Sequence, residues 1–282
     1  MYEFPCTGPI TASLHISAGN LRVIAEARST VQVTVEPKRN NDAGQAAAES
    51  TLVEMSGNTL HVETPNSKGF GLVRRSQDLN ILVRMPLDSE LEARSASADI
   101  TIEGRIDTAN INSASGDLRL EHVSGDLERH SASGDSEIGF VGGGANIVKA
   151  SGDLRVKTVG GDLSIKSSSG DVEVGAGGGS VRISTASGDV KIGSLARGEA
   201  RLNAASGDIT VGVAEGTAVW LDLNSASGDS RSELAVTDAA PAGTAPQLTL
   251  HVRTASGDIT VQRGPRFTAP VTTEAEADSL PD

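Results

Sequence analysis

Aromatic side chains are scarce in this sequence, at 2% of its 282 residues. Phe140 is the only one between Ser97 and Val219. Proteins that bind nucleic acids commonly stack bases on aromatic rings and neutralise phosphates with Lys and Arg. Because the chain also has a formal net charge of −13, we expect no nucleic-acid partner.

Cysteine and long apolar runs are also nearly absent. Cys6 is the single cysteine, so no disulfide can form within the chain. No run of 18 apolar residues occurs, which predicts no transmembrane helix. The first ten residues include Glu3, Pro5 and Gly8 and lack the apolar core of a secretion signal. We therefore expect a soluble, cytoplasmic protein with no direct membrane insertion.

A three-residue phrase, Ser-Gly-Asp, recurs through the middle of the chain and is followed by alternating apolar and polar residues. Its central copies begin 18 residues apart, at Ser115, Ser133, Ser151, Ser169 and Ser187. An imperfect copy, Ser97-Ala98-Asp99, precedes them by the same interval, and later copies begin at Ser206, Ser227 and Ser256. A fixed period kept over this many copies is typical of proteins in which repeated units stack.

Each 18-residue unit contains a second, weaker turn nine residues after the first, as in Ser124-Gly125-Asp126 and Gly160-Gly161-Asp162. A short stretch of alternating polarity follows each turn, as in a strand with one buried face. Two turns and two strands predict one coil, with Gly at the corner because it adopts positive φ without strain. The predicted fold class is all-β: a single-chain, β-helix-like β-solenoid with 18-residue coils and a β-rich N-terminal cap.

The fourth and sixth residues of each phrase are predicted to point into the solenoid. The pairs that fit are Leu118/Leu120, Leu154/Val156, Leu163/Ile165, Val172/Val174, Val181/Ile183, Val190/Ile192 and Ile209/Val211. Leu127/Arg129 and Ser136/Ile138 each break the pattern at one member. We therefore expect the coils near residues 126–138 to be the loosest.

The outward fifth position alternates in charge sign from one coil to the next. It reads Arg119, Glu137, Arg155, Glu173 and Lys191. Stacking in register would place opposite charges side by side, where each pair is worth a few tenths of a kcal/mol. We interpret this column as a structural feature that fixes the register of the coils.

The chain divides into three predicted parts. Residues 1–94 lack the period but contain strand-like stretches, so we expect them to open and cap the same solenoid. Within them, Asn41 or Asp42 followed by an alanine run predicts one short helix. Residues 95–264 hold the Ser-Gly-Asp solenoid. Residues 265–282 are rich in Pro, Thr, Glu and Asp, which is typical of a disordered acidic tail.

Two loops and one terminal strand complete the prediction. Residues 65–76 are expected to form a long exposed loop, and residues 239–246 a Pro/Ala loop inserted near the C-terminal end. The strand Ile259-Thr260-Val261 is followed by Arg263-Gly264-Pro265. Because proline cannot donate to a ladder, we expect this strand to be the last in the stack.

The Ser-Gly-Asp repeat, with Pro86 before its first copy, resembles the bacterial β-strand-repeat family called the toastrack domain, whose members are often labelled putative adhesins. The resemblance covers residues 8–263, and Glu215 to Asp222 is similar to actinobacterial members in particular. It implies a single-chain β-solenoid and, for some members, association with envelope-stress signalling. It implies no catalytic residues.

The repeated aspartates should line one edge of the solenoid, and two roles are open for them. One is calcium binding between coils, as in glycine-rich β-rolls. The second Gly-x-Asp element of those repeats is missing here, however, which favours the other role: accepting hydrogen bonds from turn N–H groups. The column consists of Asp99, Asp117, Asp135, Asp153, Asp171, Asp189 and Asp208.

The remaining polar residues give no specific site. No histidine has the spacing of a zinc ligand with another ligand type; the histidines are His15, His61, His122, His130 and His251, and we expect His122 and His130 to be exposed. Ser and Asp occur throughout the repeat, so a Ser-His-Asp triad would have no specificity. We predict no catalytic, cofactor-binding or metal-ligating residue, and no cofactor.

The sequence favours a non-enzymatic scaffold or protein-interaction module with an unidentified protein partner, linked by the resemblance to envelope-stress signalling. We expect a monomer or a small oligomer. Two alternatives are a surface adhesin or calcium-binding β-roll, and a carbohydrate-active β-helix enzyme. The enzyme is disfavoured because such enzymes work in clefts built by long loops, and the regular coils leave almost no loop between their corners.

Overall fold

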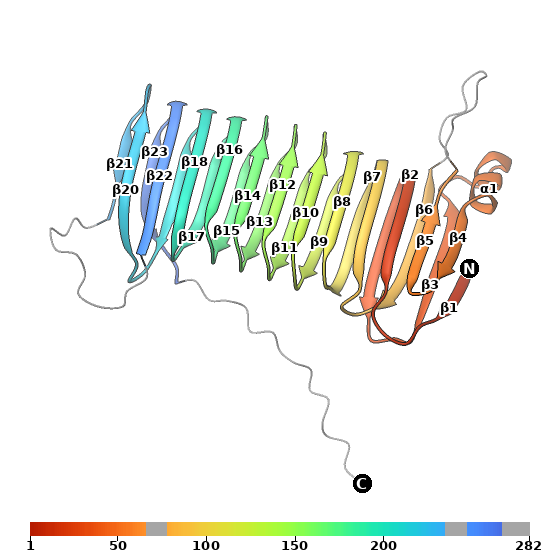
Figure 1. Ribbon diagram of the computed structural model, residues 1–282. Helices are drawn as coiled ribbons and strands as arrows, with labels where there is room; N and C mark the ends of the chain where they lie inside the picture. The colour runs from red at the N-terminus through yellow and green to blue at the C-terminus, as the bar shows by residue number, and fades with distance from the viewer. Residues whose placement is uncertain (66–77, 235–246, 267–282) are drawn as a thin grey trace, which may run out of the picture.

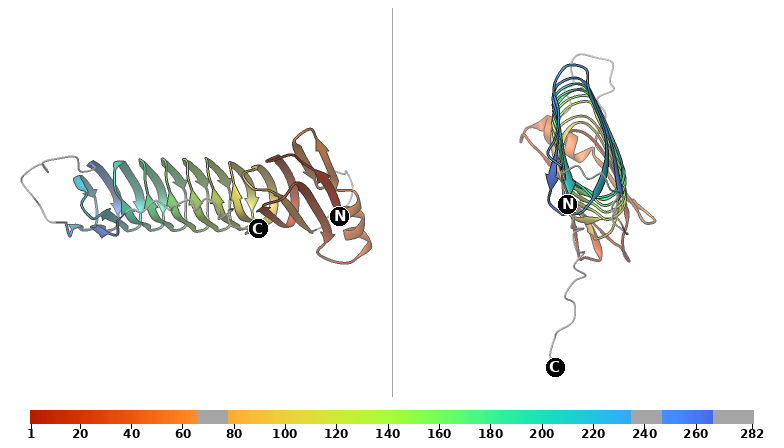
Figure 2. Two further views of the ribbon diagram at one scale, coloured as in Figure 1. Left: turned by 90° about the horizontal axis from the view of Figure 1, so that it is seen from below. Right: turned by 90° about the vertical axis from the view of Figure 1, so that its left-hand side faces the viewer.

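The computed structural model describes residues 1–65, 78–234 and 247–266. They form one elongated β-solenoid, which Figure 1 shows as a row of stacked strands. Seen along the stack, each coil is a narrow flattened loop with a sheet on each long side (Figure 2). The predicted all-β solenoid is therefore confirmed. No helix among the described residues is long and apolar enough to cross a membrane.

The regular coils place alternate strands on opposite sheets. One sheet contains β8 (Ala109–Ser115), β10 (Leu127–Ser131), β12 (Ala145–Lys149), β14 (Leu163–Ser167), β16 (Val181–Ser187) and β18 (Gly198–Ser206). The other contains β9 (Leu118–Val123), β11 (Ser136–Val141), β13 (Leu154–Val159), β15 (Val172–Gly177), β17 (Val190–Leu195) and β19 (Ile209–Ala214).

Neighbouring strands of each sheet are parallel, and paired residues lie one repeat apart. Leu127 pairs with Ala145, and Leu154 pairs with Val172. Strands β10 and β11 keep this register on both sides. The polar side chains near residues 126–138 therefore point inward without displacing the strands, and the expectation that these coils are the loosest stays a prediction.

Backbone conformation and close packing both require glycine at the corners, as Gly116 illustrates. Gly116 has a φ of 106°, in the left-handed region that favours glycine. A Cβ at Gly116 would also lie 2.3 Å from the carbonyl oxygen of Ala98 in the preceding coil. The two coils therefore approach too closely at Gly116 for a residue with a side chain. This explains why the second position of the phrase repeats so strictly.

The N-terminal end does not follow sequence order. The long strand β2 (Thr11–Glu26) pairs in parallel with β7 (Glu90–Ile106) on one side. On its other side it pairs with β5 (Thr59–Glu63) and β6 (Leu79–Pro86). Asn20 of β2 lies opposite Asp99, so residues 17–23 are a degenerate copy of the repeat phrase.

Antiparallel strands and one helix close this end. Strand β4 (Leu52–Ser56) pairs with β5, β3 (Thr30–Pro37) pairs with β6, and β1 (Tyr2–Pro5) pairs with β3. The predicted helix is α1 (Asp42–Glu49), and its N-cap Asn41 accepts a hydrogen bond from the N–H of Gly44 at 2.8 Å. The change from parallel to antiparallel pairing ends the stack.

The C-terminal end contradicts the expected strand order. Strand β22 (Gln247–Ser256) lies between β18 and β20 (Ala218–Ser225). Strand β23 (Ile259–Gly264) lies between β19 and β21 (Ser230–Ser232). The expectation that Ile259–Val261 ends the stack is therefore wrong. The outermost coil is β20–β21, and the chain returns from it to insert β22–β23 (Figure 1).

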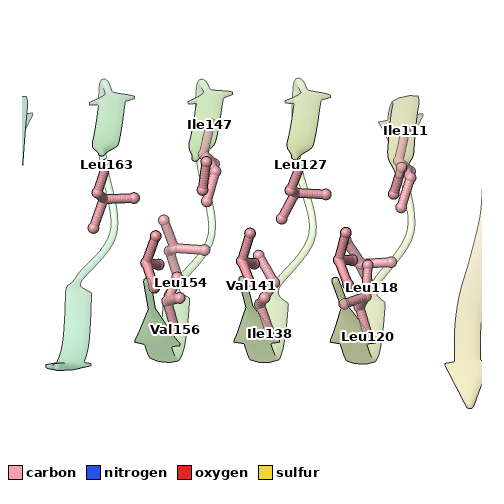
Figure 3. Close-up of a cluster of buried hydrophobic side chains, with 14 of the residues drawn as sticks. Ile111, Leu118, Leu120, Leu127, Ile138, Val141, Ile147, Leu154, Val156 and Leu163 are labelled. Carbon is pink, nitrogen blue, oxygen red and sulfur yellow. The ribbon is translucent and has the colours of Figure 1, made fainter. Parts of the chain in front are cut away.

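Aliphatic side chains from both sheets meet in a thin interior, as Figure 3 shows for Leu118, Leu127, Ile147 and Leu154. All of the predicted inward pairs are buried. The three-part division at residues 94 and 264 stays a prediction, and β7 runs through its first boundary. Of the predicted 65–76 loop, only Pro65 is among the described residues. The 239–246 loop lies outside them, as does the predicted tail except for Pro265 and Arg266.

Candidate functional site

The Ser-Gly-Asp corners lie along one edge of the solenoid, where their aspartates form a hydrogen-bonded ladder. The backbone N–H of Asp135 donates to Oδ1 of Asp117 at 2.9 Å, and that of Asp153 donates to Oδ1 of Asp135 at 2.8 Å. The same bond links Asp99 to Asp117 at one end and continues through Asp171, Asp189 and Asp208 at the other. The predicted role in accepting turn hydrogen bonds is confirmed.

The ladder also continues through the rearranged C-terminal coils. The N–H of Asp258 donates to Oδ1 of Asp208, and the N–H of Asp229 donates to Oδ1 of Asp258, both at 2.8 Å. At the weaker corner, Asp126 accepts from Gly144 and Asp162 from Ser180, also at 2.8 Å. A carboxylate oxygen at each of these corners therefore satisfies a backbone donor of the next coil.

Metal binding at this edge gains no support from the geometry. Within residues 1–65, 78–234 and 247–266, no group of three or more His, Cys, Asp or Glu side chains is placed to hold a metal ion. The ladder aspartates are spread singly, one per coil, and each contributes an oxygen to a backbone hydrogen bond. This arrangement fits a structural edge better than a calcium site.

A groove of about 470 Å³ lies beside the ladder, over the sheet that contains β9, β11, β13, β15 and β17. Its other border is the column of alternating charges. Arg155 Nε lies 2.8 Å from Glu173 Oε2, and Arg119 Nε lies 3.8 Å from Glu137 Oε2. The hydrogen bond from Arg155 lowers the pKa of Glu173. The predicted opposite-charge neighbours therefore occur, as exposed pairs of small energy.

A longer groove, of about 930 Å³, crosses the other sheet from β2 to β18. Its lining includes one column of outward side chains in register. The column runs through Glu92, Asn110, Glu128, Asn146, Ser164, Arg182 and Arg201. The groove therefore follows a row of equivalent strand positions, one per coil, along most of the solenoid.

The two ends of this long groove differ in charge. Glu90, Glu92, Asp126 and Glu128 line it over β7 to β10. Arg182, Arg201 and Glu199 line it over β16 and β18. Some of these charges are paired locally, since Arg94 lies 2.6 Å from Glu92 and Arg201 lies 2.6 Å from Glu199. The surface is thus acidic toward the N-terminal end and carries its arginines toward the C-terminal end.

Two cationic side chains among the described residues are buried inside the solenoid. Arg129 is 1% exposed and Lys149 is 3% exposed. Burial lowers the pKa of Arg129 to about 10. Burial also lowers the pKa of Lys149, to about 8, although Asp135 and Asp153 oppose the shift. Both groups are therefore mainly protonated at neutral pH inside a mainly aliphatic interior.

The histidines do not form a joint site. His122, expected to be exposed, is half-buried and packs against Phe140, with ring centroids 4.7 Å apart and the rings tilted by 52°. Burial lowers the pKa of His122. His130 lies 3.1 Å from Glu128, and Nδ1 of His251 lies 3.1 Å from Asp222 Oδ2. His15 and His61 lie on β2 and β5 at the N-terminal end.

Sequence reasoning missed the interior cluster as a unit. It identified Arg129 and Ser136 as exceptions to the apolar pattern but not Lys149. Lys149 pairs in register with Ser131 on one side and Ser167 on the other. The sequence did contain a signal for a buried Lys149, because the residues 18 positions before and after it are Ser131 and Ser167, and both lie at buried positions.

Comparison with known proteins places the chain within one family. The model described as Toastrack DUF4097 matches residues 12–262. Comparison with curated proteins finds no match. The predicted toastrack resemblance is confirmed, whereas its actinobacterial part stays a prediction.

Three solved structures are similar at low identity. A putative adhesin from Bacteroides fragilis is 14% identical and has a TM-score of 0.43, with 93% of this chain and 95% of that chain covered. A putative lipid binding protein from Parabacteroides distasonis is 17% identical (TM-score 0.40; coverage 95% and 96%). A putative adhesin from the same species is 11% identical (TM-score 0.36; coverage 92% and 95%). With TM-scores below 0.5, these structures carry no argument about function.

Proposed function

This chain belongs to the Toastrack DUF4097 family, and we propose that it is a non-enzymatic interaction module whose long groove binds an extended segment of a protein partner. The observation that carries the proposal is the groove that crosses β2 to β18. With parallel strands roughly 4.8 Å apart, the column from Glu92 to Arg201 spans roughly 29 Å. An extended peptide of about nine residues has that length.

The charge distribution defines the partner's chemistry. The end over β7 to β10 is lined by Glu90, Glu92 and Glu128. The end over β16 and β18 is lined by Arg182, Arg201 and Glu199, so it has an excess of one positive charge. Complementary charges give orientation and specificity to an interface. The expected partner segment is basic where it meets the first end and acidic where it meets the second.

The spacing of the same groups supports a binding role over a catalytic one. Glu92 and Arg201 stand at opposite ends of the column, and Asn110, Asn146 and Ser164 lie between them. Catalysis needs acid, base or nucleophile within hydrogen-bond reach of one reacting atom. A row of groups spread one per coil suits recognition of a long ligand. As the family resemblance implies for some members, we extend the proposal to a partner in envelope-stress signalling.

Site-specific photo-crosslinking in cells tests this proposal. A photoreactive residue replaces Asn146 in the middle of the groove or, as a control, the exposed Lys157 on the other sheet. We expect one discrete crosslinked protein from position 146 only, and its loss when Glu92→Lys and Glu128→Lys are added. Mass spectrometry then identifies it. Equal crosslinking from both positions, or none from position 146, would contradict the proposal.

A further inference from the structure

One stretch of the interior holds positive charge without a buried negative partner. Arg129 and Lys149 are both buried, and no Asp or Glu is among the buried residues of the described chain. Within the same residues, neither cation forms an ion pair; Arg129 makes one long hydrogen bond, 3.4 Å from its Nη1 to the carbonyl oxygen of His130. Buried charges in proteins are normally paired, because desolvating an isolated charge costs several kcal/mol.

The geometry gathers several side chains at one corner. Lys149 Nζ lies 2.6 Å from the carbonyl oxygen of Asp153, and the backbone N–H of Ser136 donates to the same oxygen at 2.9 Å. Ser131 pairs in register with Lys149 and with Ser113. Arg129 precedes Ser131 by two positions, so both point to the interior. The corner therefore collects one guanidinium, one ammonium and three hydroxyls.

Four buried polar atoms of this corner have no hydrogen-bond partner in the described protein: Arg129 Nε and the hydroxyls of Ser113, Ser131 and Ser136. In later coils, hydroxyls of the same column bond to the carbonyl two residues ahead, as Thr185 does to Ser187 at 3.1 Å and Ser167 to Ser169 at 3.2 Å. Ser113 and Ser131 do not make that bond. A buried polar group without a protein partner indicates a water or an ion that the protein binds.

All four unpartnered atoms can donate a hydrogen bond. Water could accept from them but would bring no negative charge to Arg129, whereas an anion does both. Lys149 already interacts with the carboxylates of Asp135 and Asp153. The interior between the sheets is thin and lined by aliphatic side chains such as Leu118 and Ile147 (Figure 3). We propose that this corner is an internal binding site for a small monatomic anion of the chloride class, held by Arg129, Ser113, Ser131 and Ser136, with Lys149 beside it.

Bromide, which replaces chloride and scatters anomalously, tests the proposal directly. Crystals grown in sodium bromide should show an anomalous peak inside the solenoid within hydrogen-bonding distance of Arg129 Nε. The Arg129→Ile variant should lack it. Isoleucine occupies the same column at positions 111 and 147, so this variant is expected to fold. A well-ordered interior with no bromide peak would overturn the proposal in favour of water.

Thermal unfolding in solution gives a second, independent readout. At constant ionic strength, replacing gluconate by chloride should raise the melting temperature of the native protein, because a ligand that binds only the folded state stabilises it. The rise should disappear in Arg129→Ile and persist in Arg119→Gln, which removes an arginine that is 78% exposed. Equal chloride responses in all three proteins would show a general salt effect and would overturn the proposal.

Discussion

The backbone N–H of Asp258 donates to Oδ1 of Asp208 at 2.8 Å, although 50 positions separate the two residues. Asp229, which precedes Asp258 in the sequence, takes the next place in the ladder. The ladder therefore follows the spatial order of the coils and not the order of the chain. At this end the outermost coil, β20–β21, comes earlier in the sequence than β22–β23, the coil beneath it.

Removing residues 256–282 should destabilise the C-terminal coils and cause self-association. The deletion takes away β23, which lies between β19 and β21, and leaves both with unpaired edges. A chain that ends after Arg266 keeps every described strand and should sediment like the parent. Sedimentation velocity compares the three proteins. A monodisperse, fully folded 1–255 chain would show that β23 is dispensable, contrary to its internal position.

The orientation of the strands predicts a large contrast between two nearby substitutions. Ile183→Asp places a carboxylate at a fully buried position and should unfold the array or cost at least about 3 kcal/mol. Glu173→Gln removes an exposed ion pair with Arg155 and should cost less than about 1 kcal/mol. Urea denaturation measures both. Similar losses would contradict the assigned inward and outward faces.

Calcium should not be required for folding. The ladder carboxylates already accept backbone hydrogen bonds, as Asp153 does from Asp171 at 3.0 Å. We expect the far-UV circular dichroism of chelator-treated protein to stay unchanged when millimolar calcium is added. A large gain in β signal on adding calcium would support a β-roll instead. Magnesium at the same concentration serves as the control for a general effect of divalent charge.

The buried Lys149 predicts a gain in stability at alkaline pH in chloride-free buffer. Burial lowers its pKa to about 8 from an ordinary value of 10.5. The unfolded chain therefore binds more protons than the folded one between these two values, so stability rises with pH across that window. Relative to Lys149→Ser, the native protein should gain at least about 1 kcal/mol from pH 8 to pH 10. A difference that stays flat in denaturant titrations would contradict the lowered pKa.

The regular part of the fold was predictable because each signal repeats. The 18-residue interval, the corner glycine of the Gly116 type and the alternating polarity all indicate the same coil. The aspartate ladder followed as well, since Asp at a fixed place in every coil must meet its copy in the next. The alternation of Arg155 and Glu173 likewise predicted their pairing, 2.8 Å apart in the structure.

The order of the C-terminal strands and the buried polar cluster could not be predicted from the 18-residue period. All copies of the phrase can stack on one another, so local pattern could not show that Asp258 precedes Asp229 in space. The fourth and sixth residues of each phrase do not include the strand end where Lys149 lies, so the inward-facing pattern did not predict the interior cluster. The cytoplasmic location, the partner and the oligomeric state stay predictions.

The most direct test of the proposed interaction is the affinity of the crosslinked partner segment for purified protein, measured by isothermal titration calorimetry. The double variant Glu92→Lys, Glu128→Lys should bind at least about tenfold more weakly, because it reverses charge at the acidic end of the long groove. The variant Glu137→Lys, on the other sheet, should bind as the native protein does. Equal weakening by both variants, or unchanged affinity in the double variant, would contradict a partner site in this groove.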